Sequence, residues 1–355
     1  MALHFHALKV AEITRETDDS VSIRLDVPTA LAGDFAFLPG QHLTLRVTVD
    51  GEEQRRSYSL CSAANSGEWR VGIRELPGGK VSTWANRTLR VGDTVECMAP
   101  DGTFHAVPNA AQGRHYLLVG AGSGITPLLS IARTVLAGEP RSRVTLLYGN
   151  RKLASVMFRE ALEDLKNRYL DRLALHYVFS REPQETALYE GRLDAERLHL
   201  FLDTLVPATS VDEAFLCGPD EMLEALEATL REAGMPAEHV HVERFGTASV
   251  AVPRADGVAN GTDARVTVVA DGMTREFDLP GAGASILDAA RAAGLDLPFS
   301  CKSGVCSTCR ARLKEGTVEM TRNFALMKSD LEAGFILTCQ AHPTSSRVVV
   351  DFDDR

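Results

Sequence analysis

An excess of basic residues is missing from this sequence. Its 355 residues contain 38 Lys and Arg against 48 Asp and Glu, so the formal net charge is -10. Proteins bind phosphate backbones and anionic membranes through clustered cations. This balance therefore argues against nucleic acid or a membrane surface as the partner.

Long apolar runs are missing as well. The most apolar stretch, residues 116–137, is interrupted by glycines, Pro127 and Arg133, well short of the ~20 residues that span a bilayer. The N-terminal segment has no cationic flank, sustained apolar run or small-residue cleavage site, which disfavours a secretory signal. We expect a cytoplasmic protein without a membrane anchor, in a compartment that disfavours disulfides.

Internal repeats and low-complexity segments are also absent from the sequence. Hydrophobic residues make up 45% and charged residues 24% of a chain long enough for two or three domains at ~150 residues each. A single small module and wholesale disorder are thereby excluded.

The pattern of strands and helices predicts a multi-domain chain. Short alternating strands separated by turn signals predict an antiparallel β-barrel at residues 1–110. From 111 to 246, strand-like runs alternate with amphipathic helical runs, which predicts an α/β domain with a parallel five-stranded sheet. The expected strands are 4–10, 21–27, 41–49, 68–75 and 93–99 in the barrel, and 115–120, 143–149, 173–180, 213–218 and 239–245 in the parallel sheet.

Residues 247–263 combine small residues, Gly and Pro without periodicity, which is typical of a linker. Residues 264–355 begin with a hairpin signal at Asp271 and Gly272, continue with a helical run and end in strand-like segments. This order predicts a small α+β domain, which would be marginally stable unless a bound cofactor holds it together.

Four of the seven cysteines crowd into the last domain. Cys301, Cys306 and Cys309 form C-x4-C-x2-C, and Cys339 follows after 29 intervening residues. Thiolates at this spacing are typical ligands of a [2Fe-2S] cluster. Structural zinc is the alternative, but zinc sites usually combine two short-spaced pairs, and only one C-x2-C is present.

The loop CKSGVCSTC resembles the cluster loop of plant-type ferredoxins. This resemblance covers about the last quarter of the chain and implies a β-grasp fold around a [2Fe-2S] cluster held by the four cysteines. From Ala264 onward the chain has 11 basic and 12 acidic residues, so it lacks the acidic surface of those ferredoxins.

Arg56, Ser57, Tyr58 and Ser59 follow a predicted strand. They offer a guanidinium for a phosphate, an aromatic face for a flavin ring and hydroxyls for its nitrogens. At this place in a barrel they resemble the R-x-Y-S signature of the ferredoxin-NADP reductase family. A second segment resembles the pyrophosphate-binding turn of that family and implies FAD rather than FMN. Its residues are Gly79, Lys80, Val81 and Ser82.

The same resemblance implies roles for two further side chains. Ser59 would act catalytically near flavin N5, where its hydroxyl orients the ring or moves a proton, and Phe245 would cover the ring. Strand-end hydrogen bonding and core packing are the ordinary roles of such residues.

A glycine-rich turn, GAGSGITP, follows the first strand of the α/β domain. Ile125 takes the third glycine position of G-x-G-x-x-G, which argues against an ordinary dinucleotide-binding dehydrogenase. The turn instead resembles the G-x-G-x-T-P loop of the ferredoxin-NADP reductase family, which implies Gly122, Gly124 and Thr126 at the nucleotide. Pro127 would be the first residue of the following helix. A tight turn without a ligand is the alternative for this loop alone.

Two further groups of residues favour a nicotinamide nucleotide. Cys217, Gly218 and Pro219 resemble the C-G-P motif of the same family, which implies that the Cys217 sulfur acts catalytically against nicotinamide C4. Donors that follow neighbouring strands suit an additional 2′-phosphate and favour NADPH over NADH. These donors are Arg151, Ser180 and Arg181.

The three domains predict one electron path. Hydride transfer delivers two electrons at once and a [2Fe-2S] cluster takes one, so a flavin must lie between them. Over nearly the whole chain, domain order and motifs resemble the reductase subunits of phenylacetyl-CoA epoxidase complexes. This resemblance implies NADPH, FAD and a [2Fe-2S] cluster, with a diiron oxygenase as electron acceptor in phenylacetate catabolism.

Two other functions stay open at the level of sequence. One is an FMN- and NADH-dependent reductase of another aromatic-ring oxygenase, which the identity of the extracted flavin would distinguish. The other is a redox-sensing binding protein with vestigial nucleotide folds. The intact glycine loop and C-G-P segment argue against the second.

Overall fold

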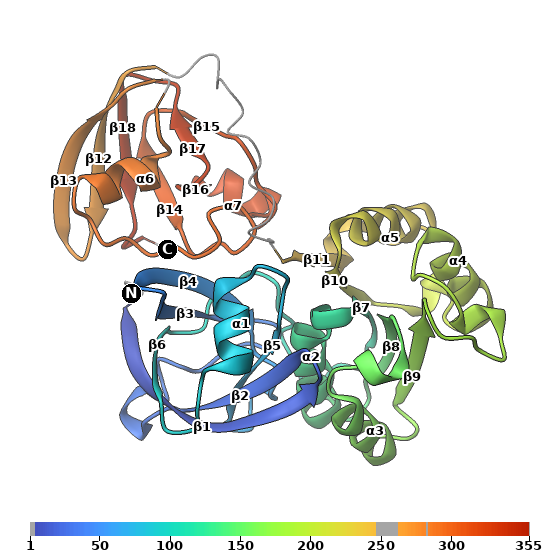
Figure 1. Ribbon diagram of the computed structural model, residues 1–355. Helices are drawn as coiled ribbons and strands as arrows, with labels where there is room; N and C mark the ends of the chain where they lie inside the picture. The colour runs from blue at the N-terminus through green and yellow to red at the C-terminus, as the bar shows by residue number, and fades with distance from the viewer. Residues whose placement is uncertain (1–3, 246–261, 282, 355) are drawn as a thin grey trace.

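The computed structural model describes residues 4–245, 262–281 and 283–354 and contains three main sheets that follow one another along the chain (Figure 1). The strands of these sheets lie within residues 5–98, 115–244 and 264–351. Among the described helices, none combines the length and the apolar character that a membrane crossing requires.

The first sheet is antiparallel and curls into a barrel with the strand order β4-β3-β6-β1-β2-β5 (Figure 1). Alternate residues of each strand point inward, so Val21, Ile23 and Leu25 of one strand enter the barrel core. The strands are β1 (Phe5–Thr17), β2 (Ser20–Asp26), β3 (His42–Val49), β4 (Glu52–Ser59), β5 (Trp69–Arg74) and β6 (Thr94–Met98). The helix α1 (Lys80–Arg87) follows β5.

Asp50 and Gly51 join β3 to β4 as a two-residue hairpin. Both have positive φ, 53° and 77°, as this tight turn requires. Residues 56–59 follow the predicted strand 41–49, which is β3, but they also form the last four residues of a strand that the sequence analysis did not expect, β4. The charged sequence of β4 does not show the apolar alternation that predicts a strand. The strand forms because it pairs along its whole length with β3.

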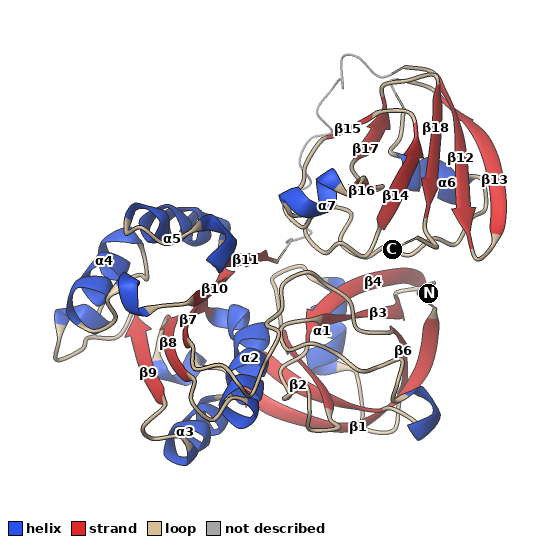
Figure 2. Cartoon of the chain, turned by 180° about the vertical axis from the view of Figure 1, so that it is seen from behind, coloured by secondary structure: helices blue, strands red, loops and turns tan. Residues whose placement is uncertain are grey.

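The second sheet is parallel and five-stranded, in the order β11-β10-β7-β8-β9, as the sequence predicts. Leu118 of β7 packs with helices α2 and α3, whereas its neighbours Leu117 and Val119 pack with α4 and α5 on the opposite face (Figure 2). The sheet is therefore covered on both faces. Its strands are β7 (His115–Ala121), β8 (Arg143–Asn150), β9 (Leu173–Phe179), β10 (Glu213–Gly218) and β11 (Val240–Arg244). The helices are α2 (Ile125–Gly138), α3 (Arg159–Arg168), α4 (Ala195–Thr204) and α5 (Asp220–Glu232).

Pro127 is the third residue of α2 and not its first, which corrects the sequence-based expectation. A single 3-10 turn over Gly122–Gly124 precedes the helix, and the helix itself begins at Ile125. Proline is tolerated there because the first turn of a helix has no internal partner for its N–H groups.

The C-terminal domain has a mixed five-stranded sheet in the order β13-β12-β18-β14-β16, and Ile286 and Leu287 of α6 join its core. Asp271 and Gly272 form the predicted hairpin turn, with φ of 53° and 69°. The strands are β12 (Ala264–Ala270), β13 (Met273–Leu279), β14 (Arg310–Glu315), β16 (Phe335–Leu337) and β18 (Arg347–Asp351), with β15 (Val318–Met320) and β17 (Ala341–Pro343) as a separate pair. The helices are α6 (Ile286–Ala292) and α7 (Lys328–Glu332).

The predicted linker, residues 247–263, lies outside the described residues up to position 261. Phe245 is the last described residue before it. In both ribbon views the C-terminal domain lies against β3 and β4 of the barrel (Figures 1 and 2). This contact places the cysteine loop beside the segment that the sequence assigns to a flavin.

Candidate functional site

The four cysteines of the C-terminal domain face one another in two pairs. The Cys306 sulfur lies against that of Cys301, and this contact lowers the pKa of Cys301 and raises that of Cys306. In the same way, contact with the Cys309 sulfur raises the pKa of Cys339. Backbone amides also point at the sulfurs: the N–H of Ser303 donates to Cys301 Sγ at 3.3 Å.

The loop that carries these cysteines is wound tightly. Lys302, Gly304 and Ser307 all have positive φ, and a Cβ on Gly304 would lie 3.0 Å from the carbonyl oxygen of Arg322. Within the described residues, no three His, Cys, Asp or Glu side chains converge as ligands of one metal ion. The pairwise arrangement of four thiols and the inward amides fit a cluster with two iron atoms.

Arg56 and Tyr58 point to the same side of β4, because alternate side chains of a strand share a face. The Tyr58 ring packs against the barrel core, and burial raises the pKa of its hydroxyl. Lys80, the first residue of α1, forms an ion pair of 2.5 Å with Glu52, the first residue of β4. The pair places a helix N-terminus beside the strand, so a guanidinium, an aromatic ring and free helix amides fit a flavin with a phosphate chain.

The turn before α1 is held by its own side chains. Ser82 is buried; its hydroxyl donates to the Gly79 carbonyl at 3.2 Å and accepts from the Leu76 N–H at 3.1 Å. A Cβ on Gly79 would lie 2.4 Å from that hydroxyl, so a side chain there would displace the Ser82 hydroxyl from these hydrogen bonds. Val81 enters the barrel core. These residues therefore shape the turn, and a ligand there would meet its backbone.

The two glycine segments of the second domain pack directly on each other. A Cβ on Gly124 would lie 2.1 Å from the carbonyl oxygen of Cys217, and one on Gly218 would lie 2.5 Å from Met222 Cε. Gly122 has a positive φ of 55°, and its carbonyl accepts a 2.8 Å hydrogen bond from the Tyr148 hydroxyl. The loop thus lies close to the carboxyl end of β10, where parallel sheets bind ligands.

Cys217 is fully buried in β10, and burial raises the pKa of its thiol well above the ordinary value. The thiol is therefore neutral, which suits packing against a ring better than nucleophilic attack.

The two neighbouring motif residues have structural roles. Pro219 is the residue that directly precedes α5. Thr126 is buried and donates its hydroxyl to the Ser123 carbonyl at 3.0 Å, so its side chain stabilises the loop.

Arg151, Ser180 and Arg181 lie together at the carboxyl ends of β8 and β9. The Arg181 N–H donates to the Arg151 carbonyl at 2.9 Å, and the Ser180 N–H donates to the Asn150 carbonyl at 2.9 Å. All three predicted residues are exposed. Two guanidinium groups and a hydroxyl are therefore presented at one edge of the sheet.

Ser59 and Cys217, from different domains, meet around Glu243, a residue to which the sequence analysis assigns no role. The Ser59 hydroxyl donates to Glu243 Oε2 at 3.3 Å, and Glu243 pairs with Cys217 in the adjacent strand. Part of Glu243 remains accessible, but its carboxyl group is enclosed, and this burial raises its pKa to about 8. Phe245, two residues further, packs partly on the core of the second domain.

Arg74 is a second residue that sequence reasoning missed. It ends β5 of the barrel, and its Nη1 lies 3.2 Å from where a Cβ of Gly122 would be. Asp19 orients the guanidinium through a 2.9 Å hydrogen bond from Nε. A cation from the barrel therefore reaches the glycine loop of the neighbouring domain, and no spacing signal in the sequence indicates this.

Comparisons with known proteins match all three domains. The oxidoreductase FAD-binding domain family matches residues 7–106, the oxidoreductase NAD-binding domain family 118–228 and the 2Fe-2S iron-sulfur cluster binding domain family 268–344. A component of the 1,2-phenylacetyl-CoA epoxidase of Escherichia coli K12 is 45% identical over 98% of both chains. The chain belongs to the family of oxygenase reductases with flavin, nicotinamide and iron–sulfur domains.

Other relatives of this reductase serve different oxygenases. The ferredoxin reductase component of 3-ketosteroid-9-alpha-monooxygenase from Mycolicibacterium smegmatis is 38% identical over 99% of this chain and 98% of that protein. Phthalate dioxygenase reductase, a solved structure, is 25% identical with a TM-score of 0.57, and the match covers 98% of each chain. The reductase thus matches, over almost its whole length, relatives that belong to different oxygenase systems.

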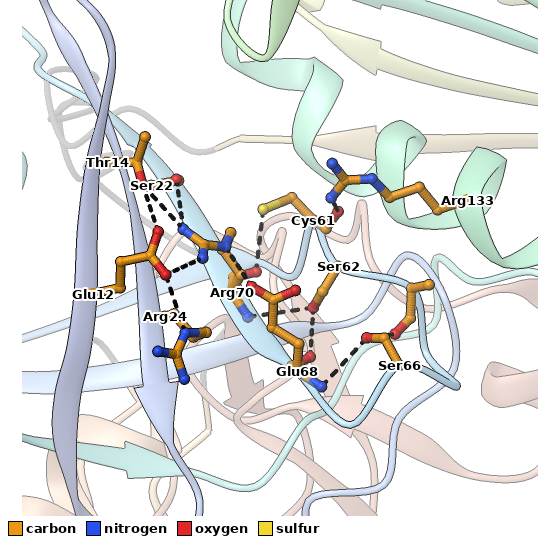
Figure 3. A network of polar contacts seen from close by, with 11 residues as sticks. Glu12, Thr14, Ser22, Arg24, Cys61, Ser62, Ser66, Glu68, Arg70 and Arg133 are labelled. Atoms are coloured by element: carbon orange, nitrogen blue, oxygen red, sulfur yellow. Dashed lines mark hydrogen bonds and ion pairs between the residues drawn. The ribbon is translucent and has the colours of Figure 1, made fainter. Parts of the chain in front are cut away.

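A polar network holds the first two domains of the reductase together (Figure 3). Arg133 of α2 donates to the Cys61 carbonyl at 2.8 Å, and Ser130 of the same helix donates to the Ser62 carbonyl at 2.7 Å. On the barrel side, Arg70 pairs with both Glu12 and Glu68, at 3.0 Å and 2.6 Å. Because buried hydrogen bonds are costly to break, this network holds the flavin barrel and the nicotinamide sheet in one orientation.

Proposed function

We propose that this reductase takes a hydride from NADPH and passes the electrons through FAD and a [2Fe-2S] cluster to the diiron oxygenase component of a phenylacetyl-CoA epoxidase. One observation carries the proposal. Within β4, the Ser59 side chain bonds to Glu243 of the nicotinamide domain, and the Ser57 side chain bonds to Ser300 beside the cluster ligand Cys301. A flavin on this strand would therefore lie between the two other redox sites.

The identity of the acceptor rests on the relatives. The epoxidase component matches the chain at 45% identity from end to end, against 38% for the steroid monooxygenase component. We also propose a cytoplasmic localisation, which agrees with the free cysteines of the chain. We propose that the domains comprise residues 1–110, 111–246 and 264–355, because each range contains one of the three main sheets.

When bound, the flavin would supply the conversion between a two-electron hydride and single electrons. The residues of the chain bind and orient around it. Arg56 would neutralise a phosphate, and the Tyr58 ring would orient the flavin ring. Glu243 holds a proton at neutral pH because of its raised pKa, and its Oε2 accepts a hydrogen bond from the Ser59 hydroxyl at the end of β4. Cys217 fills space at the nicotinamide and excludes water.

NADPH is the proposed donor because of the charge at the ends of β8 and β9. Arg151 and Arg181 are exposed neighbours, and Lys152 adds a third cation beside them. Paired guanidinium groups bind a phosphate with fixed geometry. The Glu182 carboxylate next to them is held at the backbone, where it accepts the Leu153 N–H at 2.9 Å.

An anaerobic absorbance titration tests the electron path. NADPH should bleach the flavin band first and the cluster bands afterwards in the same protein. Adding the oxygenase component and phenylacetyl-CoA should then give substrate-dependent NADPH consumption in air. A colourless protein would contradict the cofactor assignment, and reduction without coupling to that oxygenase would overturn only the acceptor. Extracted FMN in place of FAD would overturn the flavin assignment.

A further inference from the structure

Arg55 is a buried arginine whose side chain leaves the barrel and enters the C-terminal domain. Its side chain is 4% exposed. Nη2 donates to Asp296 Oδ1 at 2.7 Å, and Nη1 donates to the Leu297 carbonyl at 3.2 Å. Nε donates to Glu53 of its own strand at 2.9 Å. All three nitrogens of the guanidinium therefore have partners, two of them in the other domain.

Aromatic rings pack against this guanidinium as well. Its central carbon lies 4.3 Å from the ring centroid of Phe299 in the C-terminal domain and 5.0 Å from that of Phe5 in β1. A planar cation over an aromatic face is attracted by the ring, and the attraction increases when water is excluded. Arg55 thus joins the two domains by a salt bridge, a hydrogen bond and ring stacking at one point.

The partners of Arg55 lead directly into the cluster loop. Asp296, Leu297 and Phe299 precede Ser300, whose hydroxyl accepts a 2.9 Å hydrogen bond from Ser57. Arg55 and Ser57 share one face of β4, because they are two residues apart. The opposite face carries Arg56 and Tyr58, which face the proposed flavin site. One strand therefore carries both the contacts to the cluster loop and the residues of the proposed flavin site.

We propose that Arg55 is the positioning residue for electron transfer from the flavin to the cluster, because it fixes the cluster loop against β4. This inference rests on the proposed function. Each NADPH oxidised to NADP⁺ releases two electrons and one proton. Each electron that crosses the seam oxidises the flavin by one electron and reduces the cluster by one, and the acceptor then removes it. Arg55 touches neither reacting group and sets only the separation between them.

The burial of Arg55 gives a way to distinguish a fixed interface between the barrel and the C-terminal domain from transient docking of that domain. Exposed charges more than about 10 Å apart are largely screened at 0.1 M salt, whereas charges in partly buried contact are screened much less. The Arg55 side chain is 4% exposed, so its contact with Asp296 belongs to the second kind. If the interface between the barrel and the C-terminal domain is fixed, the rate of cluster reduction by the flavin stays constant as ionic strength rises. If the C-terminal domain instead docked through exposed charges, salt would lower that rate.

The matched variants are Arg55→Gln at the seam and Arg265→Gln on β12. Arg265 pairs with Asp278 at 3.0 Å within the C-terminal domain, and both side chains are exposed, so the control removes the same charge away from the seam. In anaerobic stopped-flow mixing with NADPH, Arg55→Gln should leave flavin reduction unchanged and slow cluster reduction several-fold, because the rate of electron transfer falls as the flavin and the cluster move apart. Arg265→Gln should change neither phase.

A second readout does not depend on turnover. Amide hydrogen exchange in residues 296–300 should rise in Arg55→Gln, while exchange in the β12–β13 hairpin and the midpoint potential of the cluster stay unchanged. Arg55→Lys should reduce the cluster almost as slowly as Arg55→Gln, because an ammonium group cannot bond to Asp296, Leu297 and Glu53 in the geometry of a guanidinium. Asp296→Asn, at a side chain that is 68% exposed, should slow the same phase and keeps the test valid if Arg55→Gln misfolds.

The outcomes separate this inference from the proposed function. Wild-type protein that reduces neither flavin nor cluster with NADPH would overturn the proposed function. Normal wild-type kinetics, together with unchanged cluster reduction and unchanged exchange in Arg55→Gln, would overturn the role of Arg55 alone. Exchange that rises without a slower cluster phase would show that Arg55 holds the seam but does not set the rate, and would also overturn the proposal.

Discussion

The Ser59 hydroxyl donates a 3.3 Å hydrogen bond to Glu243 Oε2 across the seam between the barrel and the parallel sheet. The two residues are 184 positions apart. Their contact forms because the end of β4 meets the end of β11, and it encloses the carboxyl group of Glu243. A carboxylic acid that keeps its proton at neutral pH is thereby located beside the proposed flavin and nicotinamide sites.

The raised pKa of Glu243 gives the fold a pH dependence. Below pH 4.5, the ordinary value for Glu, folded and unfolded chains both hold the proton. Between that value and about 8, only the folded chain keeps it, so the free energy of unfolding falls as pH rises through this window. The slope from this group is at most about 1.4 kcal/mol per pH unit. Glu243→Gln should remove this fall.

Thermal unfolding at pH 5.5 and pH 8, followed by flavin release, checks this prediction. The stability of Glu243→Gln relative to wild type should increase from the lower to the higher pH. Glu232→Gln, at an exposed position at the end of α5, serves as control and should show no such change. An equal pH response of Glu243→Gln and wild type would show that the Glu243 carboxyl group is not protonated in the folded chain.

Gly124→Ala should disable the nicotinamide site while sparing the other two. The new Cβ would lie 2.1 Å from the carbonyl oxygen of Cys217, so the loop or β10 must move. Overpacking of this kind costs about 1–3 kcal/mol. Flavin and cluster absorbance should persist, and flavin reduction by NADPH should slow strongly. Gly138→Ala, in open space at the end of the same helix, should behave as wild type.

Arg181→Ala should weaken NADPH binding selectively. Loss of a charge-assisted hydrogen bond to the 2′-phosphate costs up to about 2 kcal/mol, which corresponds to a KM for NADPH raised by up to about 30-fold. The KM for NADH should change little, because NADH lacks that phosphate. Arg168→Ala, an exposed arginine at the end of α3, is the control. Parallel changes for both nucleotides would contradict the phosphate assignment.

Cys306→Ser should remove the cluster and leave hydride transfer intact. Cys306 is the buried partner of Cys301, and its loss leaves three of the four thiols that the proposed cluster needs. The absorbance of the iron–sulfur centre and electron delivery to the oxygenase should disappear. The rate of flavin reduction by NADPH should equal that of wild type. A comparable loss of flavin reduction would contradict a linear electron path.

Features with a local signal could be predicted from the amino-acid sequence alone. The spacing of four cysteines, the glycine turn after a strand and the alternation of strands with helices each predict a structure within a short stretch of chain. Turn signals at Asp50 and Asp271 likewise appear as hairpins. Such patterns are readable because backbone geometry and ligand spacing act between neighbouring residues.

The side chains that meet at the seams between domains could be identified only in the folded chain. No local pattern assigns a role to Glu243, Arg74 or Arg55, and each gains its role from a partner in another domain, such as Asp296 at 241 positions from Arg55. Burial, enclosure of a carboxyl group and contact between hydroxyls depend on how separate cores pack together. Pairing with β3 likewise made a strand of the charged segment 52–59, because hydrogen bonds to a neighbouring strand outweigh a weak local preference.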